Sequence, residues 1–172
     1  MTTIIRLPQT ADLEALTQLY NHYVLNTTIT FDIEPYTVDQ RREHWWCHYA
    51  PQGRHRLWVA EKDQVVIGYA SSSKLREKAA YDTSVETSIY LCPEVQGQGI
   101  GTQLYRALFR SLAEEDVHRA YAGITLPNPG SIALHQKFGF HSVGCYREVG
   151  RKFDRYWHVE WFEKALPAAD AF

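Results

Sequence analysis

One carboxylate and three closely spaced glycines near the middle of the chain are the residues best suited to catalysis and ligand binding. A strand-like segment at residues 85–91 carries Glu86 and leads, through a short polar stretch, to Gly97, Gly99 and Gly101. The glycines open an amphipathic helix, and the free N–H groups at the start of a helix bind anions such as phosphate. A carboxylate nearby could accept a proton from a reacting group. The pattern predicts an anion site beside a general base.

The glycine pattern differs from the two common nucleotide-binding loops. A dinucleotide fingerprint, G-x-G-x-x-G, would need glycine where Thr102 stands when the count begins at Gly97. A Walker loop needs Gly-Lys followed by Ser or Thr, and this stretch contains no lysine. A dinucleotide fold also places its loop after the first strand, whereas this loop comes past mid-chain. A plain connecting turn remains the alternative, but alternating glycines at a helix start favour a role that needs bare backbone.

Hydrophobic periodicity and capping signals predict the elements that position these residues. In chain order they are a short strand at 3–6, a helix capped by Thr10, an irregular extended segment at 26–35, a helix from the capping box 37–40 to about Tyr49, a hairpin at 57–70 with its turn at 61–64, a polar loop at 71–78, a central strand at 81–91, the helix after the glycines, a strand at 121–126, a short helix capped by Ser131, and closing strands near 141–147 and 157–162. Alternation along the central strand sends Glu86, Ser88 and Tyr90 to one face.

Composition excludes several classes of function. With 172 residues, of which 45% are hydrophobic and 22% charged, the chain is expected to form one globular domain. A formal net charge of −2 gives no electrostatic case for nucleic-acid binding. No run approaches the roughly 20 apolar residues that a membrane span needs, so we expect no membrane association.

Cysteine and histidine positions argue against disulfides and metals. The three cysteines, Cys47, Cys92 and Cys145, are far apart and fit no zinc spacing, which favours a reducing compartment and a cytoplasmic location. His44 and His48 would share a helix face, but no third ligand accompanies them. We therefore expect no metal.

Two stretches resemble a known family. Gln96, Gly99 and Gly101 match, position by position, the pyrophosphate-loop motif Q/R-x-x-G-x-G/A of the GNAT superfamily of acetyl-CoA-dependent N-acetyltransferases, and residues 128–140 resemble its second cofactor motif. The order of elements resembles that family over almost the whole chain. The resemblance implies an α/β (α+β) GNAT fold with a mixed central sheet of about seven strands flanked by about four helices. A single domain would span 1–166, followed by a loose tail at 167–172.

A narrower resemblance concerns the acceptor. Residues 31–35, 80–82 and 85–90 look like the phosphinothricin/methionine-sulfoximine acetyltransferase branch, and residues 150–153 resemble the start of its G-x-K-[FH]-G-x-W-x-D-V segment. The chain then departs from that segment at Asp154, Tyr156 and His158. The branch implies a small amino acid or analogue as acceptor, and a homodimer as assembly.

Acetyl transfer to an amine needs a proton acceptor, because an α-amino group with a pKa near 8 is mostly protonated at neutral pH. The resemblance implies that Glu86 is this base and that His135 assists the thiolate leaving group. From the pattern alone, Glu86 could equally be a surface residue on a half-solvated strand, and His135 could simply pack beside Ile132.

The resemblance also implies the binding residues. Acetyl-CoA would be held by Ile89, Tyr90, Leu91, Gln96, Gly97, Gln98, Gly99, Ile100, Gly101, Thr102, Asn128 and Ser131. The acceptor would contact Phe31, Arg76, Lys78 and Tyr81, although the basic pair could belong to a solvated loop. Two other functions stay open: a peptide or protein N-terminal acetyltransferase, which would need an open groove, and a non-catalytic acyl-CoA sensor, which Glu86 and His135 argue against.

Overall fold

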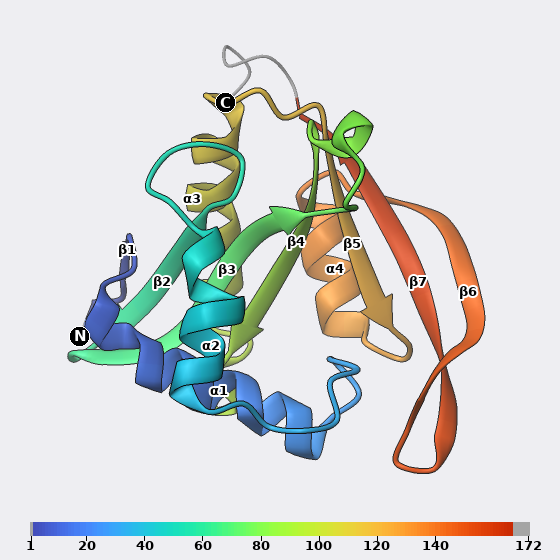
Figure 1. The fold of residues 1–172 in the computed structure, drawn as a ribbon, viewed down its shortest axis with the longest axis horizontal. Helices are drawn as coiled ribbons and strands as arrows, with labels where there is room; N and C mark the ends of the chain where they lie inside the picture. The colour runs from blue at the N-terminus through green and yellow to red at the C-terminus, as the bar shows by residue number, and fades with distance from the viewer. Residues whose placement is uncertain (1, 167–172) are drawn as a thin grey trace.

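A single mixed sheet of seven strands forms the centre of the molecule. The computed structural model describes residues 2–166, so the predicted tail at 167–172 lies outside the described residues. The strands are β1 (Ile4–Arg6), β2 (Leu57–Lys62), β3 (Val65–Lys74), β4 (Ser84–Leu91), β5 (Arg119–Thr125), β6 (His141–Lys152) and β7 (Arg155–Ala165), in the spatial order β1-β2-β3-β4-β5-β7-β6 (Figure 1). The expected mixed sheet and fold class are confirmed.

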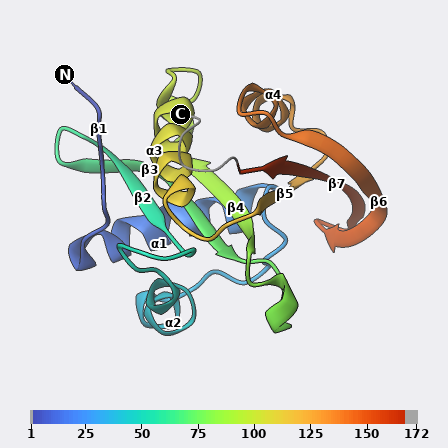
Figure 2. The ribbon, with the colours of Figure 1, turned by 90° about the horizontal axis from the view of Figure 1, so that it is seen from above.

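Four helices cover the two faces of this sheet. They are α1 (Leu13–Asn26), α2 (Val38–His44), α3 (Ile100–Ala113) and α4 (Pro129–Lys137). Figure 2 shows α3 and α4 on one face and α1 and α2 on the other. None of the helices within residues 2–166 is long and apolar enough to cross a membrane.

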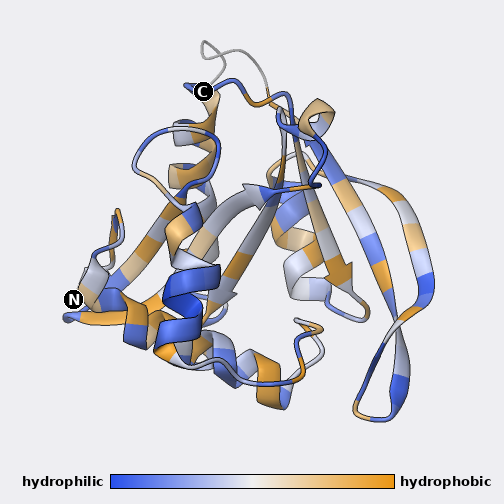
Figure 3. Ribbon diagram, viewed as in Figure 1, coloured by the Kyte–Doolittle hydropathy of each residue, from blue (hydrophilic) through white to orange (hydrophobic). Residues whose placement is uncertain are grey.

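The core is divided between these two faces. On the α3 side, Leu104, Leu108 and Leu112 are fully buried against the sheet, as their spacing of four predicts. On the α1 side, Leu16 and Tyr23 pack with residues of β2 and β3. Hydrophobic and hydrophilic residues alternate along β6 and β7, at the exposed end of the sheet (Figure 3).

Strands β4 and β5 are the parallel pair at the centre, and they separate soon after they start. Their register covers only three residue pairs, from Ser84–Arg119 to Glu86–Tyr121. Figure 1 shows the two strands diverging beyond that point. The residues of β4 after Glu86 therefore pair with β3 alone, and their other backbone edge borders the opening between the strands.

The expected alternation along β4 is confirmed. Val85, Ile89 and Leu91 pack into the α3-side core, whereas Tyr90 packs with the aromatic cluster on the α1 side. Glu86 and Ser88 share the face of Tyr90, because side chains two residues apart in a strand point the same way. The general-base candidate thus faces the α1–α2 side of the sheet.

Several predicted boundaries were wrong for identifiable reasons. Residues 71–74, expected in a loop, continue β3. Ser71 and Ser72 can be buried there, and the Ser72 hydroxyl donates a hydrogen bond of 2.8 Å to the Arg54 carbonyl. The central strand starts at Ser84 rather than 81, since residues 79–81 form a 3₁₀ turn. The second helix ends at His44, and Trp46–His48 form a separate 3₁₀ turn.

Two predicted caps were also wrong. Asn128, not Ser131, caps α4: its side-chain oxygen accepts from the Ser131 N–H at 3.1 Å. At the first helix, Gln9 rather than Thr10 precedes the opening 3₁₀ turn, and Asp12 accepts from the Gln9 N–H at 2.7 Å. At α4 the cap is a neighbour with an equally suitable polar side chain, which spacing cannot distinguish.

The β6–β7 turn gives a stability prediction. Phe153 and Asp154 connect the strands with φ values of 51° and 56°, the left-handed backbone in which a second-position glycine is preferred. We expect Asp154→Gly to raise Tm by stabilising the protein by about 0.5–1 kcal/mol. The exposed Arg151–Asp154 pair that is lost contributes little.

The β2–β3 turn offers a matched variant for this prediction. Gln64 occupies the same second turn position with φ 64°. Gln64→Gly should stabilise at least as much, because glutamine tolerates this backbone less well than aspartate does. A lower Tm in both glycine variants would contradict this explanation of turn strain.

Candidate active site

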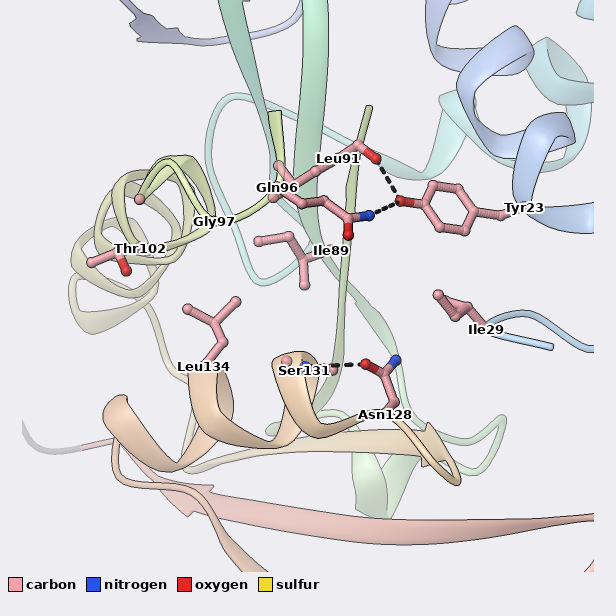
Figure 4. A pocket seen from close by; sticks show the side chains of 13 residues that line it. Tyr23, Ile29, Ile89, Leu91, Gln96, Gly97, Thr102, Asn128, Ser131 and Leu134 are labelled. Carbon is pink, nitrogen blue, oxygen red and sulfur yellow. Dashed lines mark hydrogen bonds between the residues drawn. The ribbon is translucent and has the colours of Figure 1, made fainter. Parts of the chain in front are cut away.

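A cleft of about 450 Å³ lies between the glycine loop, the end of β4 and the start of α4 (Figure 4). Its lining residues are Tyr23, Ile29, Ile89, Leu91, Gln96, Gly97, Gly99, Gly101, Thr102, Asn128, Gly130, Ser131 and Leu134. Nine of these residues belong to the set expected to bind acetyl-CoA. The cleft therefore joins the two sequence motifs, which lie about 30 residues apart in the chain, into one site.

The glycine loop presents bare backbone to the cleft. Gly97 and Gly99 have φ values of 76° and 79°, and Gly99 is the residue that precedes α3. A Cβ atom built on either glycine would meet nothing within 4 Å, so the space beside the loop is open. The first N–H groups of a helix have no partner within the helix. The loop thus combines room for an anion with donors to hold it, and its residues fit a pyrophosphate group.

Three of the expected cofactor residues do not line the cleft, and one of them, Tyr90, lines the smaller pocket described below. Ile100 is 2% exposed and lies in the hydrophobic core. Gln98 turns back along the loop, where its side-chain amide donates to the Glu94 carbonyl at 3.1 Å. Any contribution of Ile100 to binding would come from its backbone.

The walls of the cleft include residues that sequence reasoning missed. The Tyr23 hydroxyl donates to the Leu91 carbonyl and accepts from the Gln96 side-chain amide at 3.2 Å. This network fixes Gln96, the first residue of the pyrophosphate motif, against α1 (Figure 4). Ile29 and Leu134 complete the apolar lining. No local signal in the sequence marks the Tyr23 hydroxyl as part of this site.

A smaller pocket of about 50 Å³ continues the cleft into the opening between β4 and β5. It shares Ile29, Ile89, Asn128 and Ser131 with the cleft. Its other lining residues are Thr87, Ser88, Tyr90, Tyr105, Ala122, Gly123, Ile124, Thr125 and His135. Tyr90, expected to bind the cofactor, and His135, expected to be catalytic, therefore both line the pocket where the two strands separate.

His135 is buried, and both of its ring nitrogens have partners. Nδ1 lies 2.7 Å from the Ser131 carbonyl oxygen, and Nε2 lies 2.8 Å from the Tyr105 hydroxyl. A carbonyl can only accept, so we assign the hydrogen to Nδ1, and Nε2 accepts from Tyr105. Burial lowers the pKa of His135, which favours this neutral form. Of the two side chains in the Tyr105–His135 hydrogen bond, only Tyr105 can turn its hydrogen to another acceptor, by rotation of its hydroxyl group.

Glu86 is half-buried on β4, immediately before Thr87 of the smaller pocket, and its own side chain lines neither space. Burial raises the pKa of its carboxyl group, and the positive charge of Arg76 opposes this rise in part. Within residues 2–166, no hydrogen bond to its carboxylate oxygens is found, which leaves them available to a ligand. A carboxylate with a raised pKa accepts protons more readily than an exposed one.

The expected acceptor residues occupy two places around Glu86. Arg76 lies 5.9 Å from the ring centre of Trp161, and Phe31 lies against the α-carbon of Gly150. Lys78 and Tyr81 are exposed, and neither lines the cleft or the smaller pocket. Arg76 is exposed as well and lines neither space, but its positive charge acts on the Glu86 carboxyl group. Trp161 was not identified from the sequence.

Metal ligands do not gather at this site. Within the described part of the chain, no group of three or more histidine, cysteine, aspartate or glutamate side chains is placed to hold a metal ion.

Comparisons with known proteins identify the family. Residues 16–140 match the model of the Acetyltransferase (GNAT) family. The chain is 55% identical over 157 residues to a phosphinothricin N-acetyltransferase of Streptomyces coelicolor, covering 90% of this chain and 91% of that protein. It is 33% identical over 156 residues to an L-methionine sulfoximine/L-methionine sulfone acetyltransferase of Pseudomonas paraeruginosa, covering 91% and 90%.

A solved structure agrees with this assignment. A phosphinothricin acetyltransferase from Sinorhizobium meliloti, in complex with acetyl-CoA, superposes with a TM-score of 0.91 at 31% identity. The match covers 100% of this chain and 92% of that one. The resemblance seen in the two sequence motifs is thereby confirmed over the whole fold, and the chain belongs to the GNAT acetyltransferase family as an N-acetyltransferase.

Proposed function

We propose that the protein transfers the acetyl group of acetyl-CoA to the α-amino group of a small amino acid or analogue of the phosphinothricin or methionine sulfoximine/sulfone type. The observation that carries this proposal is that two spaces adjoin. The cleft at the glycine loop fits a pyrophosphate group, and it shares four lining residues with the smaller pocket between β4 and β5, which Thr87, the residue after Glu86, lines. The relatives named above act on amino-acid analogues, which supports the acceptor class.

In this proposal Glu86 takes the proton from the incoming amine. Its raised pKa makes it a better base than an exposed glutamate, and the positive charge of Arg76 favours the ionised form that accepts the proton. The carboxylate either contacts the amine or acts through one water molecule. The Gly97–Gly101 loop holds the pyrophosphate, and Asn128 and the free edge of β4 at residues 89–91 border the path of the pantetheine arm.

Tyr105, positioned by His135, stabilises the leaving thiolate. We expect the Tyr105 O–H to turn from His135 Nε2 to the departing sulfur and to donate a hydrogen bond there, without losing its proton. Burial raises the pKa of Tyr105, so the hydroxyl stays protonated. His135 then acts mainly by holding Tyr105 in place through the 2.8 Å contact.

Tyr105→Phe tests this assignment. A hydrogen bond to a charged group contributes about 1.5–3 kcal/mol, so we expect kcat to fall about 10- to 100-fold. The KM for acetyl-CoA should change little, because the phenyl ring keeps the packing. Steady-state kinetics with Tyr69→Phe, another fully buried tyrosine, provides the control. Wild-type kcat in Tyr105→Phe would assign the Tyr105–His135 pair to packing alone.

On the acceptor side, Arg76 would bind an acidic group of the amino acid, since a guanidinium pairs well with carboxylate and phosphinate oxygens. Phe31 would form an apolar wall. Lys78 and Tyr81, both exposed, would take part only by turning toward a bound acceptor. These assignments concern specificity, and the transfer chemistry depends on Glu86.

A free-thiol release assay tests the function as a whole. The purified protein is mixed with acetyl-CoA and, in turn, phosphinothricin, methionine sulfoximine, methionine sulfone, the standard amino acids and short peptides. We expect thiol release with the analogues and little with the peptides. Release confined to peptides would reassign the protein to N-terminal acetylation, and binding of acetyl-CoA without release for any amine would make it a sensor.

A further inference from the structure

The loop between α1 and α2 is tied to the β6–β7 hairpin by two contacts. Lys152, 4% exposed, donates from Nζ to the Thr30 carbonyl at 2.9 Å, across 122 positions of sequence. One residue further along the loop, the Phe31 ring lies on Gly150 so closely that a Cβ there would be 2.1 Å from its Cε2 atom. We call these two contacts the loop–hairpin bridge.

The loop side of the bridge is itself rigidly held. Asp32 accepts hydrogen bonds from the Tyr20 hydroxyl at 2.6 Å and from the Tyr36 hydroxyl at 3.1 Å. The Tyr20 hydroxyl also lies 2.8 Å from the Thr30 hydroxyl. Because α1 carries Tyr20, these bonds fix the loop to the body of the protein before it reaches the hairpin.

The bridge lies on the acceptor side of β4. Ile29, next to Thr30, lines both the cleft and the smaller pocket. The Tyr20 ring, which anchors Thr30, contacts the Tyr90 ring at 5.2 Å between centres. Tyr90 shares the strand face of Glu86, so the bridge spans from this face to the hairpin. Any chain that continued from an amine at Glu86 in this direction would meet it.

We propose that the loop–hairpin bridge restricts the acceptor to free amino acids and excludes peptide N-termini, with Lys152 as a specificity-determining residue. The inference rests on the proposed function. A free amino acid ends at its carboxylate and needs no space beyond the bridge. A peptide continues from its first carbonyl and needs a path between the loop and the hairpin. Lys152 and Phe31 occupy that path.

Two variants open the bridge by different routes. Lys152→Met removes the donor to Thr30 while keeping a side chain of similar length. Gly150→Ala places a methyl group where the Phe31 ring now lies and forces the ring away. Lys164→Met is the matched control, because Lys164 is a lysine of low exposure on β7 that donates to the Phe138 carbonyl at 2.7 Å, on the α3–α4 side of the sheet.

The experiment compares kcat/KM for L-methionine sulfone and for its dipeptide with a C-terminal glycine. We expect the wild type to prefer the free amino acid by about 100-fold or more, a ratio that a site with satisfied polar contacts can supply. Lys152→Met and Gly150→Ala should each reduce this preference at least about tenfold, and Lys164→Met should leave it unchanged. An unchanged preference in both bridge variants, or a wild type that acetylates the dipeptide equally well, would overturn the proposal.

Amide hydrogen exchange gives a readout that does not depend on catalysis. Exchange at residues 27–36 should speed up at least about tenfold in Lys152→Met and stay unchanged in Lys164→Met. If the wild type acetylates no amine, the proposed function fails. Amide hydrogen exchange at residues 27–36 then still tests whether the bridge holds the loop. Unaltered exchange of the loop in Lys152→Met would show that the bridge does not hold it, and the inference would fall.

Discussion

Glu86→Gln is expected to lower kcat by about 10²- to 10⁴-fold, the range that a positioned general base contributes. Glutamine keeps the size and polarity of the side chain but cannot accept the proton of the amine. In the proposed function acetyl-CoA binds in the cleft at the glycine loop, which Glu86 does not line, so its Kd should stay close to that of the wild type. Thiol release under saturating acceptor, together with calorimetric titration of acetyl-CoA, measures the two quantities separately.

The pH dependence of the same variant makes the assignment specific. In the wild type, kcat/KM should fall as the pH drops through the raised pKa of Glu86, because the protonated carboxyl group no longer accepts a proton. This acidic limb should be absent from the residual activity of Glu86→Gln. Glu77→Gln, which removes a charge from an exposed carboxylate near Arg76, should keep both the rate and the limb.

Stability should change in the opposite direction to activity. Since folding raises the pKa of Glu86, stability from this group is fully present below the unfolded pKa and is lost as the pH rises through the folded one. Above its folded pKa the ionised Glu86 therefore destabilises the fold, and Glu86→Gln should raise Tm in that pH range. A variant with wild-type turnover at neutral pH would remove Glu86 from the mechanism.

Gly99→Ala is expected to weaken acetyl-CoA binding at least about tenfold, seen as a higher Kd and KM. The added methyl group would enter the open space beside the loop, and the φ of 79° would favour a different backbone for alanine, at a cost of about 1–2 kcal/mol. Either change disturbs the N–H groups that the loop presents to the pyrophosphate. The value of kcat under saturating acetyl-CoA should change much less.

Gly53→Ala separates the effect on binding from the effect on backbone strain. Gly53 has φ 89°, an added Cβ would also meet nothing within 4 Å, and it lines neither the cleft nor the smaller pocket. Both alanine variants should therefore lose similar stability in thermal unfolding, but only Gly99→Ala should bind acetyl-CoA more weakly. Equal affinities in the two variants would contradict the role of the glycine loop.

Local patterns in the sequence predicted the glycine loop and the strand face that carries Glu86. Gly97 and Gly99 could be assigned because a left-handed turn before an amphipathic helix leaves few other residue choices. The face of Glu86 followed from simple alternation, which the core positions of Val85 and Ile89 confirm. The fold class was implied by the resemblance of the two cofactor motifs and of the element order to the GNAT superfamily, and the observed mixed sheet confirms it.

Contacts between distant segments could not be predicted in the same way. Tyr105 has the spacing of an ordinary core residue in α3, and only the approach of α4 places its hydroxyl on His135. Lys152 looks like an exposed hairpin residue, yet it is buried because the loop at Thr30 covers it. A single sequence carries no signal for such pairs, because their partners are 30 and 122 positions away.

The early separation of β4 from β5 sets a compromise between robustness and activity. A sheet in which both strands stayed paired to their ends would bury more backbone hydrogen bonds and would resist unfolding better. It would also close the space that the reaction needs. Mutations that draw the two strands together beyond Glu86 should therefore be selected against, even where they stabilise the fold. The centre of this sheet is the place where a higher thermal stability and an unchanged turnover are hardest to combine.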